Sequence, residues 1–207
     1  MVAAYHLIWT AYGYWLPNDP RGGTSSELRC VELAPLGEIH SGRKKVQPSS
    51  REISEFYGAA EGLLKHELQT FYDAQCPLMA DCFDKVIREN SLTYYACAIM
   101  PDHVHILIRK HRLQAEEMIK RLQDASRSVI LESPQFAHGP EHPVWGVPGW
   151  KVFLNTQDDI RRMIRYVEQN PVKIGKPMQR WPFVKEYDGW LPGQVRYAKP
   201  AKPQARR

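Results

Sequence analysis

The chain has 207 residues, of which 43% are hydrophobic and 25% are charged, and its formal net charge is +5. This composition is typical of an ordinary globular protein and argues against a disordered or fibrous chain. No apolar run approaches the roughly 20 residues that a membrane span requires, and the N-terminal stretch lacks the basic start of a secretory signal, so we expect a cytoplasmic protein.

The N-terminal third of the chain predicts one strand, a long loop and a helix. Residues 4–14 are rich in aromatic and β-branched residues, which is typical of a strand. Residues 17–50 contain Pro and Gly and show no strong period, so we expect a loop insertion there. Residues 51–73 carry apolar side chains at helical spacing and predict a helix.

The middle of the chain predicts a hairpin between two helices. Apolar residues at helical spacing indicate helices over 78–90 and 113–131. The apolar runs at 93–100 and 103–109 are typical of strands. The Pro-Asp pair between these runs indicates a tight turn, so the two strands should pair with each other.

The C-terminal part predicts one more strand and one more helix. Residues 149–154 favour a short strand, which follows a loop at 133–150. A helix is expected over 155–170, with N-cap residues at its start and Pro171 directly after its end.

This order of elements predicts an α+β fold. The natural arrangement is a ferredoxin-like or RRM-like antiparallel sheet with helices packed on one face. We expect residues 1–190 to form a single domain that contains the insertion at about 17–50. The remaining residues, 191–207, are interpreted as a basic, disordered tail.

Two histidines one residue apart in the strand at 103–109 are the first candidate site. Because strand side chains alternate between faces, His103 and His105 lie on the same face, while Val104 and Ile106 point to the other. Two imidazoles on one face can converge on one divalent ion. The alternative is that both are surface residues of an open sheet, and a metal site would in any case need a third ligand.

The last predicted helix carries the second candidate group. Tyr166 and Asn170 are spaced i, i+4, so they share one helix face. A tyrosine beside an amide that can bind a metal could act as a nucleophile next to a ligand. The alternative is that Tyr166 is a rim aromatic and that Asn170 only ends the helix before a proline.

Positive charge gathers around this helix and beyond it. Residues 161–207 hold 12 Lys and Arg against 3 Asp and Glu, a net +9, whereas residues 1–160 hold 16 against 20, a net −4. A basic segment on a slightly acidic body favours a nucleic-acid partner. The basic residues that flank the tyrosine are candidate contacts to a DNA backbone, with a solvated helix face as the alternative: Arg161, Arg162, Arg165, Lys173 and Lys176.

The motifs "MPDHVHILI" (100–108) and "YVEQNPVKIG" (166–175), in this order, resemble the HUH single-tyrosine transposases, and most closely the REP-associated tyrosine transposases. The stretch "WTAYGYWLPNDPRGG" (9–23) is also similar to the opening of many members. This resemblance implies that His103, His105 and Asn170 hold a divalent metal, Mg²⁺ or Mn²⁺, and that Tyr166 is the nucleophile. The segment 17–50 is longer than a minimal member of the family needs.

The resemblance implies a transposase-like enzyme that cuts and rejoins single-stranded or hairpin DNA through a 5′-phosphotyrosine, acting as a monomer or homodimer at the nucleoid. Two alternatives stay open. One is a domesticated, non-catalytic DNA-binding protein of the same fold. The other is a metal-dependent hydrolase in which water attacks, although the sequence offers no obvious general base near the histidines. Tryptophans could stack on bases or simply pack in the core: Trp9, Trp15, Trp145, Trp150 and Trp181.

Overall fold

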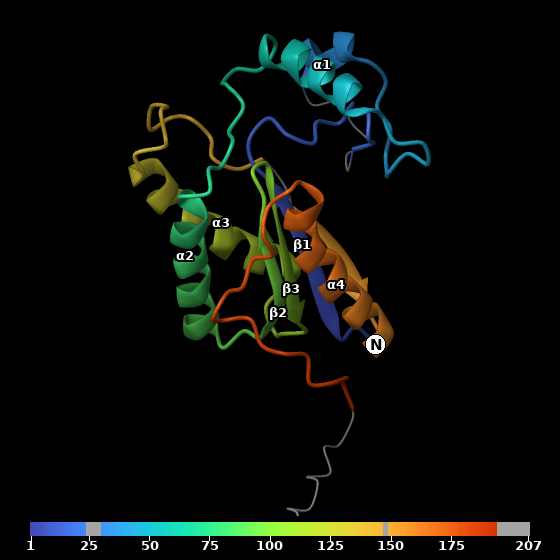
Figure 1. Cartoon of the computed structure of the whole chain (residues 1–207), viewed down its shortest axis with the longest axis vertical. Helices are drawn as coiled ribbons and strands as arrows, with labels where there is room; N and C mark the ends of the chain where they lie inside the picture. Colours follow the sequence, from blue (N-terminus) through green and yellow to red (C-terminus); the bar gives the residue numbers. More distant parts are fainter. Residues whose placement is uncertain (24–29, 147–148, 194–207) are drawn as a thin grey trace, which may run out of the picture.

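A four-stranded antiparallel sheet forms the centre of the computed structural model, which describes residues 1–23, 30–146 and 149–193 (Figure 1). The strands are β1 (Ala4–Thr10), β2 (Tyr94–Ile99), β3 (His103–Arg109) and β4 (Trp150–Leu154), in the spatial order β2-β3-β1-β4. With helical segments between β1 and β2, the last of them directly before β2, and one helix between β3 and β4, this is the ferredoxin-like arrangement. The α+β prediction is therefore confirmed.

One face of the sheet is covered by α2 (Gln75–Asn90) and α3 (Ala115–Glu132). Every second residue of β1 and β3 points into this layer, including Leu7, Trp9 and Ile106, each 1% exposed or less. Phe83 of α2 and Leu122 of α3 meet them there. Fully burying side chains of this size contributes about 1.5–3 kcal/mol each, so this layer is the main core.

The other face of the sheet carries α4 (Gln157–Lys173), which departs from the prediction that the helices pack on one face. The prediction holds for α2 and α3 only. The residues of β1 and β2 on this second face include Ala4, Ala96 and Ala98, whose small side chains let a helix approach closely. The apolar stripe of α4 covers them, with Val167 fully buried.

The segment between β1 and α2 forms a cap above one end of the sheet, and α1 (Ser50–Glu61) is its main helix (Figure 1). The predicted insertion at 17–50 also contains a short 3₁₀ helix, η1 (Val31–Leu36). A capping box between Ser49 and Glu52 begins α1. The expected helix over 51–73 was too long, since α1 ends before Gly62.

The extended path of the residues after α1 explains that early end. The backbone N–H of Gln69 donates to Tyr12, and that of Phe71 donates to Pro101, which ties the segment to the top of the sheet. Its leucines lie at helical spacing but pack under the loop that follows β1, where Gly13 adopts a φ of +83°. Tertiary contacts outweigh the local pattern here.

The predicted end of the last helix was also wrong. Asn170 and Pro171 lie inside α4, which continues to Lys173 before Gly175 turns at a φ of +75°. A proline so close to the C-terminal end removes one backbone hydrogen bond and leaves the rest of the helix intact. The hairpin was predicted correctly, since β2 and β3 pair in antiparallel register around the Pro101-Asp102 turn.

The edge of the sheet at β2 is covered by the chain that follows α4. The side-chain amide of Gln179 accepts from the backbone N–H of Ile99 and donates to its carbonyl, and the backbone N–H of Lys185 donates to Tyr94. These bonds satisfy an edge that would otherwise be open to another strand. None of the described helices is long and apolar enough to cross a membrane. Of the tail predicted at 191–207, residues 194–207 lie outside the described part of the chain.

Candidate active site between the sheet and α4

The two histidines of β3 face α4 and their rings converge, as the strand alternation predicted. The Nε2 atoms of His103 and His105 lie 2.9 Å apart. Two nitrogen ligands at right angles on one octahedral ion, each about 2.1 Å from it, would be separated by about 3 Å. His105 is buried and His103 is half-buried at the end of the strand, so the pair opens toward solvent on one side.

Each of these rings is held through its second nitrogen. The Nδ1 atom of His103 lies 2.6 Å from the Asp102 carboxylate. The Nδ1 atom of His105 lies 2.9 Å from Nε2 of His6, a buried residue of β1. Such contacts fix ring orientation and tautomer, which is what metal-binding imidazoles generally require. Sequence reasoning missed both partners: Asp102 looked like a turn residue, and His6 becomes visible only once β1 pairs with β3.

The buried imidazoles are neutral at pH 7. Burial lowers the pKa of His105 well below its usual range, and the charges of His103, His6 and Lys173 act in the same direction. Burial, with a contribution from His103, lowers the pKa of His6 to about 4. Because a neutral imidazole is the form that binds a metal, this environment suits ligation.

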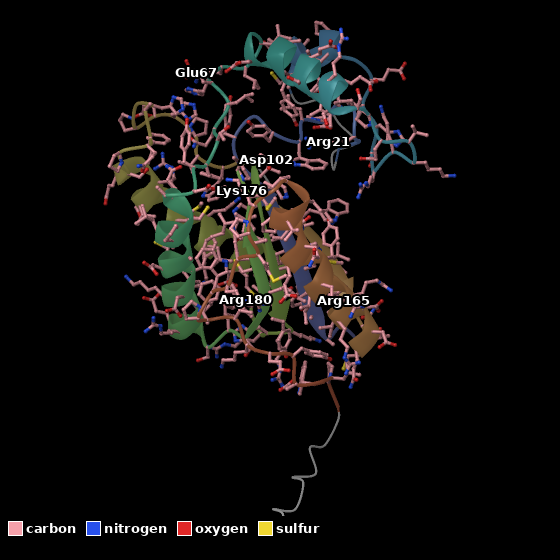
Figure 2. The ribbon with its side chains drawn as sticks, viewed as in Figure 1. Arg21, Glu67, Asp102, Arg165, Lys176 and Arg180 are labelled. Carbon is pink, nitrogen blue, oxygen red and sulfur yellow. The ribbon has the colours of Figure 1, made fainter. Side chains whose placement is uncertain are left out.

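The Asp102 carboxylate keeps its negative charge beside this pair. Burial would raise the pKa of Asp102, but the hydrogen bond from His103 and the charges of His103 and Arg21 lower it. Arg21 comes from the cap, and Figure 2 shows it where the cap meets the turn that carries Asp102. The cap therefore contributes positive charge at the edge of the site.

Tyr166 lies on the face of α4 that covers the histidines. Its ring centroid is 5.6 Å from that of His105 and 6.1 Å from that of His6, both in edge-to-face contact. The side chain is 36% exposed, so the phenol remains open to a large substrate. The ammonium of Lys173, about two turns further along the helix, lies 4.4 Å from the tyrosine ring centroid.

Asn170 is also on the inner side of α4 and is only 8% exposed. Its Nδ2 atom is buried and has no hydrogen-bond partner within the described chain. Because amide O and N positions can be exchanged by a flip, the side chain can present its oxygen to a cation instead. Asn170 thus combines burial with an unused hydrogen-bonding group.

The spacing of the two imidazole nitrogens of His103 and His105 is compatible with one divalent metal ion. The Nε2 atoms of the two imidazoles converge at 2.9 Å, and Asn170 offers a buried amide on the helix that covers this face of the sheet. Within the described residues, no three His, Cys, Asp or Glu side chains gather in a way that could hold a metal ion. A site here would therefore depend on the amide or on substrate oxygens for its third ligand.

The five basic residues predicted to contact DNA fall into different places. Lys173 lies over Tyr166, and Lys176 forms an ion pair with Asp73. Arg162 is exposed and bonds to Asp159 in its own helix. Arg161 and Arg165 lie on the opposite edge of α4, away from the tyrosine, where they line a groove. The structure does not gather all five around Tyr166.

The tryptophans also divide by location. Trp9 and Trp145 are buried in the core and contact each other at 6.0 Å between centroids. Trp15 lies in the cap, and its ring centroid is 6.4 Å from that of His103. The Arg21 guanidinium lies 3.9 Å from the centroid of the Trp15 ring. The backbone of Trp15 has a φ of +54°, a left-handed conformation that is unusual for a bulky residue. Trp15 therefore contacts the candidate site through the ring of His103.

A family model adds independent information on this region. The model described as "Transposase IS200 like" matches residues 63–170, just over half of the chain. The matched range contains both histidines of β3 as well as Tyr166 and Asn170. It begins after β1 and most of the cap, so it contains neither His6 nor Trp15. No curated protein matches the chain.

Solved structures give more distant likenesses. The chain is similar to a REP-associated tyrosine transposase bound to a REP hairpin, with 12% identity, a TM-score of 0.47 and coverage of 87% of this chain and 74% of that one. It is also similar to a candidate transposase from Deinococcus radiodurans R1, with 14% identity, a TM-score of 0.39 and coverage of 86% and 93%.

Proposed function

This chain belongs to the IS200-like transposase family, and from that premise we propose that it nicks and rejoins single-stranded or hairpin DNA with Tyr166 as nucleophile. The observation that carries the proposal is the position of the Tyr166 ring, 5.6 Å from the ring of His105. A phenol that is open to solvent on one side and faces a histidine pair on the other is well placed to meet a phosphodiester bound at that pair. We further propose that it acts on nucleoid DNA in the cytoplasm.

In the proposed reaction, the phenol oxygen of Tyr166 attacks a backbone phosphorus. The new O–P bond forms as the bond to the 3′ oxygen breaks, which leaves a 5′-phosphotyrosine and a free 3′-hydroxyl. The phenol gives up its proton to solvent as it attacks, and the leaving 3′ oxygen takes one up from solvent. The Lys173 ammonium, 4.4 Å from the centre of the tyrosine ring, offsets the negative charge that develops on the phenol. A 3′-hydroxyl can then attack the phosphotyrosine and restore a phosphodiester, so rejoining needs no ATP.

The residues that would hold a divalent metal, Mg²⁺ or Mn²⁺, are His103, His105 and Asn170. When bound, such an ion would polarise the phosphate and stabilise charge on the leaving oxygen. Asp102 and His6 would keep the two imidazoles in their ligating orientation through the contacts at 2.6 Å and 2.9 Å. With neutral ligands, the site keeps a net positive charge that favours an incoming phosphate.

We propose that Tyr166 acts within its own subunit, so that a monomer is sufficient. The ring contact to His105 is made inside one chain, without exchange of α4 between copies. Mixing His103→Ala protein with Tyr166→Phe protein tests this point. If the two groups act in cis, the mixture stays inactive; recovered activity would mean that the tyrosine reaches the metal site of a partner.

The central experiment incubates the protein with labelled single-stranded oligonucleotides, including hairpins taken from the DNA that flanks its gene, with Mg²⁺ or Mn²⁺. We expect a covalent protein–DNA band on a denaturing gel, absent with Tyr166→Phe and with a chelator. Tyr72→Phe, at another exposed tyrosine on the surface, is the matched control and should leave the band unchanged.

Two other results would favour the alternatives. Cleavage by Tyr166→Phe without an adduct would indicate a hydrolase in which water attacks. Binding without cleavage across a wide panel of hairpins would indicate a DNA-binding protein without this chemistry.

A further inference from the structure

A groove runs along the edge of α4 that faces away from Tyr166. Its volume is about 520 Å³, and its walls are α4 on one side and residues 180–187 on the other. Arg161, Arg165 and Glu168 are spaced i, i+4 and i+7, which places them on one helix edge, while Tyr166 lies on another. This groove is therefore separate from the histidine pair, although one helix borders both.

Three basic side chains that form no ion pair in the described part of the chain converge on the groove. Arg165 comes from α4, whereas Arg180 and Lys185 come from the opposite wall (Figure 2 labels the two arginines). Within the described part of the chain, none of these three forms an ion pair, although most other basic residues on the helices do. Three unpaired cations around one hollow attract an anion, and guanidinium groups suit phosphate in particular.

The remaining lining favours a nucleotide over a free phosphate. Tyr187 supplies an aromatic ring, which packs edge-on against that of Tyr95 at 4.9 Å between centroids. Glu168 and Glu186 supply carboxylates, which repel a bare anion but accept hydrogen bonds from the amino groups of bases. Aromatic rings beside basic side chains are the usual surface for unpaired bases and their phosphates. The volume is within the range of sites for small ligands.

The outer wall of the groove is fixed in place before any ligand arrives. The side chain of Gln179 makes two bonds to Ile99, and the backbone of Lys185 donates to Tyr94, so this wall is joined to the edge of the sheet. A smaller cavity of about 140 Å³ continues past Arg180 and shares Glu168 with the larger one. A preformed site loses less conformational entropy on binding.

We propose that this groove binds an unpaired nucleotide of the DNA substrate, with its phosphate on Arg165, Arg180 and Lys185 and its base against Tyr187. This inference rests on the proposed function and extends it, because it places a second contact to the same DNA across α4 from the reacting tyrosine. The groove would hold a flanking single strand while the phosphodiester to be cut lies at the histidine pair.

The test measures binding of a hairpin oligonucleotide with and without a single-stranded extension, using Arg180→Glu and the matched control Lys85→Glu. Lys85 is exposed on α2, on the opposite face of the sheet, and its replacement changes the net charge equally. We expect Arg180→Glu to bind the extended hairpin about tenfold more weakly, and Lys85→Glu to bind it like wild type. Arg180→Lys should recover most of the affinity, and thermal melting checks that each variant folds.

A second measurement locates the base. Oligonucleotides with 5-iododeoxyuridine at successive unpaired positions are photocrosslinked to the wild-type protein, and the attached peptide is identified by mass spectrometry. One position should crosslink within residues 180–187. The inference is overturned if Arg180→Glu binds as Lys85→Glu does, or if every crosslink falls elsewhere, while the Tyr166 adduct still forms. If wild-type protein neither binds nor forms an adduct, the proposed function fails and the groove assignment fails with it.

Discussion

The second nitrogen of each histidine in the pair has a different kind of partner. His103 contacts the half-buried carboxylate of Asp102, whereas His105 contacts the buried ring of His6. The carboxylate can hold a donated proton and adds negative charge, which strengthens the imidazole as a ligand. The His6 ring adds orientation without charge, since burial keeps it neutral at pH 7. Asp102 is therefore the partner whose charge should matter most.

Replacement of Asp102 with Asn should weaken the metal site without removing a ligand. The amide can still accept from His103, so ring orientation persists, but the negative charge is lost. Changes of this kind cost about 10–100-fold in metal affinity. We expect the Mn²⁺ concentration that gives half of the maximal adduct yield to rise by about tenfold or more, and excess Mn²⁺ to restore the yield.

Asp84→Asn is the control for that measurement, because Asp84 pairs with Arg88 on α2, on the other face of the sheet. It should leave the Mn²⁺ dependence unchanged. An identical midpoint for Asp102→Asn and wild type would show that the carboxylate only shapes the turn.

The residues of the site differ in how far sequence alone could identify them. Strand alternation placed His103 and His105 on one face, and helical spacing put Tyr166 and Asn170 on one helix. His6 could not be found this way, because its contact with His105 depends on the register of β1 against β3. The role of Asp102 was hidden because a Pro-Asp pair is already explained by the turn.

At the scale of elements, the cap is held together by a buried ionic cluster. The Asp19 carboxylate is fully buried and accepts from the Arg21 guanidinium at 2.9 Å and 2.7 Å, and from the Tyr57 hydroxyl of α1. That hydroxyl also accepts from the backbone N–H of Trp15 at 2.8 Å. One carboxylate thus connects α1 to the loop that brings Trp15 toward His103.

Asp19→Asn should loosen the cap and leave the sheet folded. Removing one partner of a buried ion pair costs about 3–5 kcal/mol, because the remaining charge stays buried without its counter-charge. Hydrogen exchange followed by mass spectrometry should show faster exchange in peptides from 12–23 and 50–61. Peptides from β2 and β3 should keep their protection.

Asp124→Asn, which breaks an exposed pair with Lys120, is the control and should change neither region. Equal loss of protection in the cap and the sheet would mean that the two unfold as one unit. Unchanged protection in both would mean that the cluster contributes little to the cap.

The cap also contains the helix whose length was predicted incorrectly. The apolar residues of 51–73 fit a helix, yet only Ser50–Glu61 forms one. The rest is drawn out by backbone bonds to Tyr12 and Pro101, which come from distant parts of the chain. By contrast, the start of α4 was predicted correctly. The Thr156 hydroxyl accepts a hydrogen bond from the backbone N–H of Asp159, and this cap depends only on residues that are neighbours in the sequence.

At the scale of the whole molecule, α4 divides the basic residues of the C-terminal quarter. Lys173 lies at the tyrosine, while Arg161 and Arg165 lie at the groove on the other edge. Residues 161–193 hold 7 Lys and Arg against 3 Asp and Glu, a net +4, and residues 194–207 add 5 basic residues and no acidic one. Composition predicted a nucleic-acid partner, but it could not show which basic residues lie at the tyrosine and which lie at the groove. That assignment depends on where residues 180–187 run relative to α4.

Deleting residues 194–207 separates these two sources of charge. Each phosphate neutralised on a single strand contributes about 0.7 to the slope of log affinity against log salt, so the loss of five charges should reduce that slope by up to about 3.5. Adduct formation at saturating DNA should not change, since every proposed site residue remains. Fluorescence anisotropy across a salt series measures the slope, with Arg180→Gln, expected to lower it by about 0.7, as a reference. If the slope does not change on deletion, the salt dependence belongs to residues 161–193. If the adduct is lost at saturating DNA, residues 194–207 help to position the DNA strand at Tyr166.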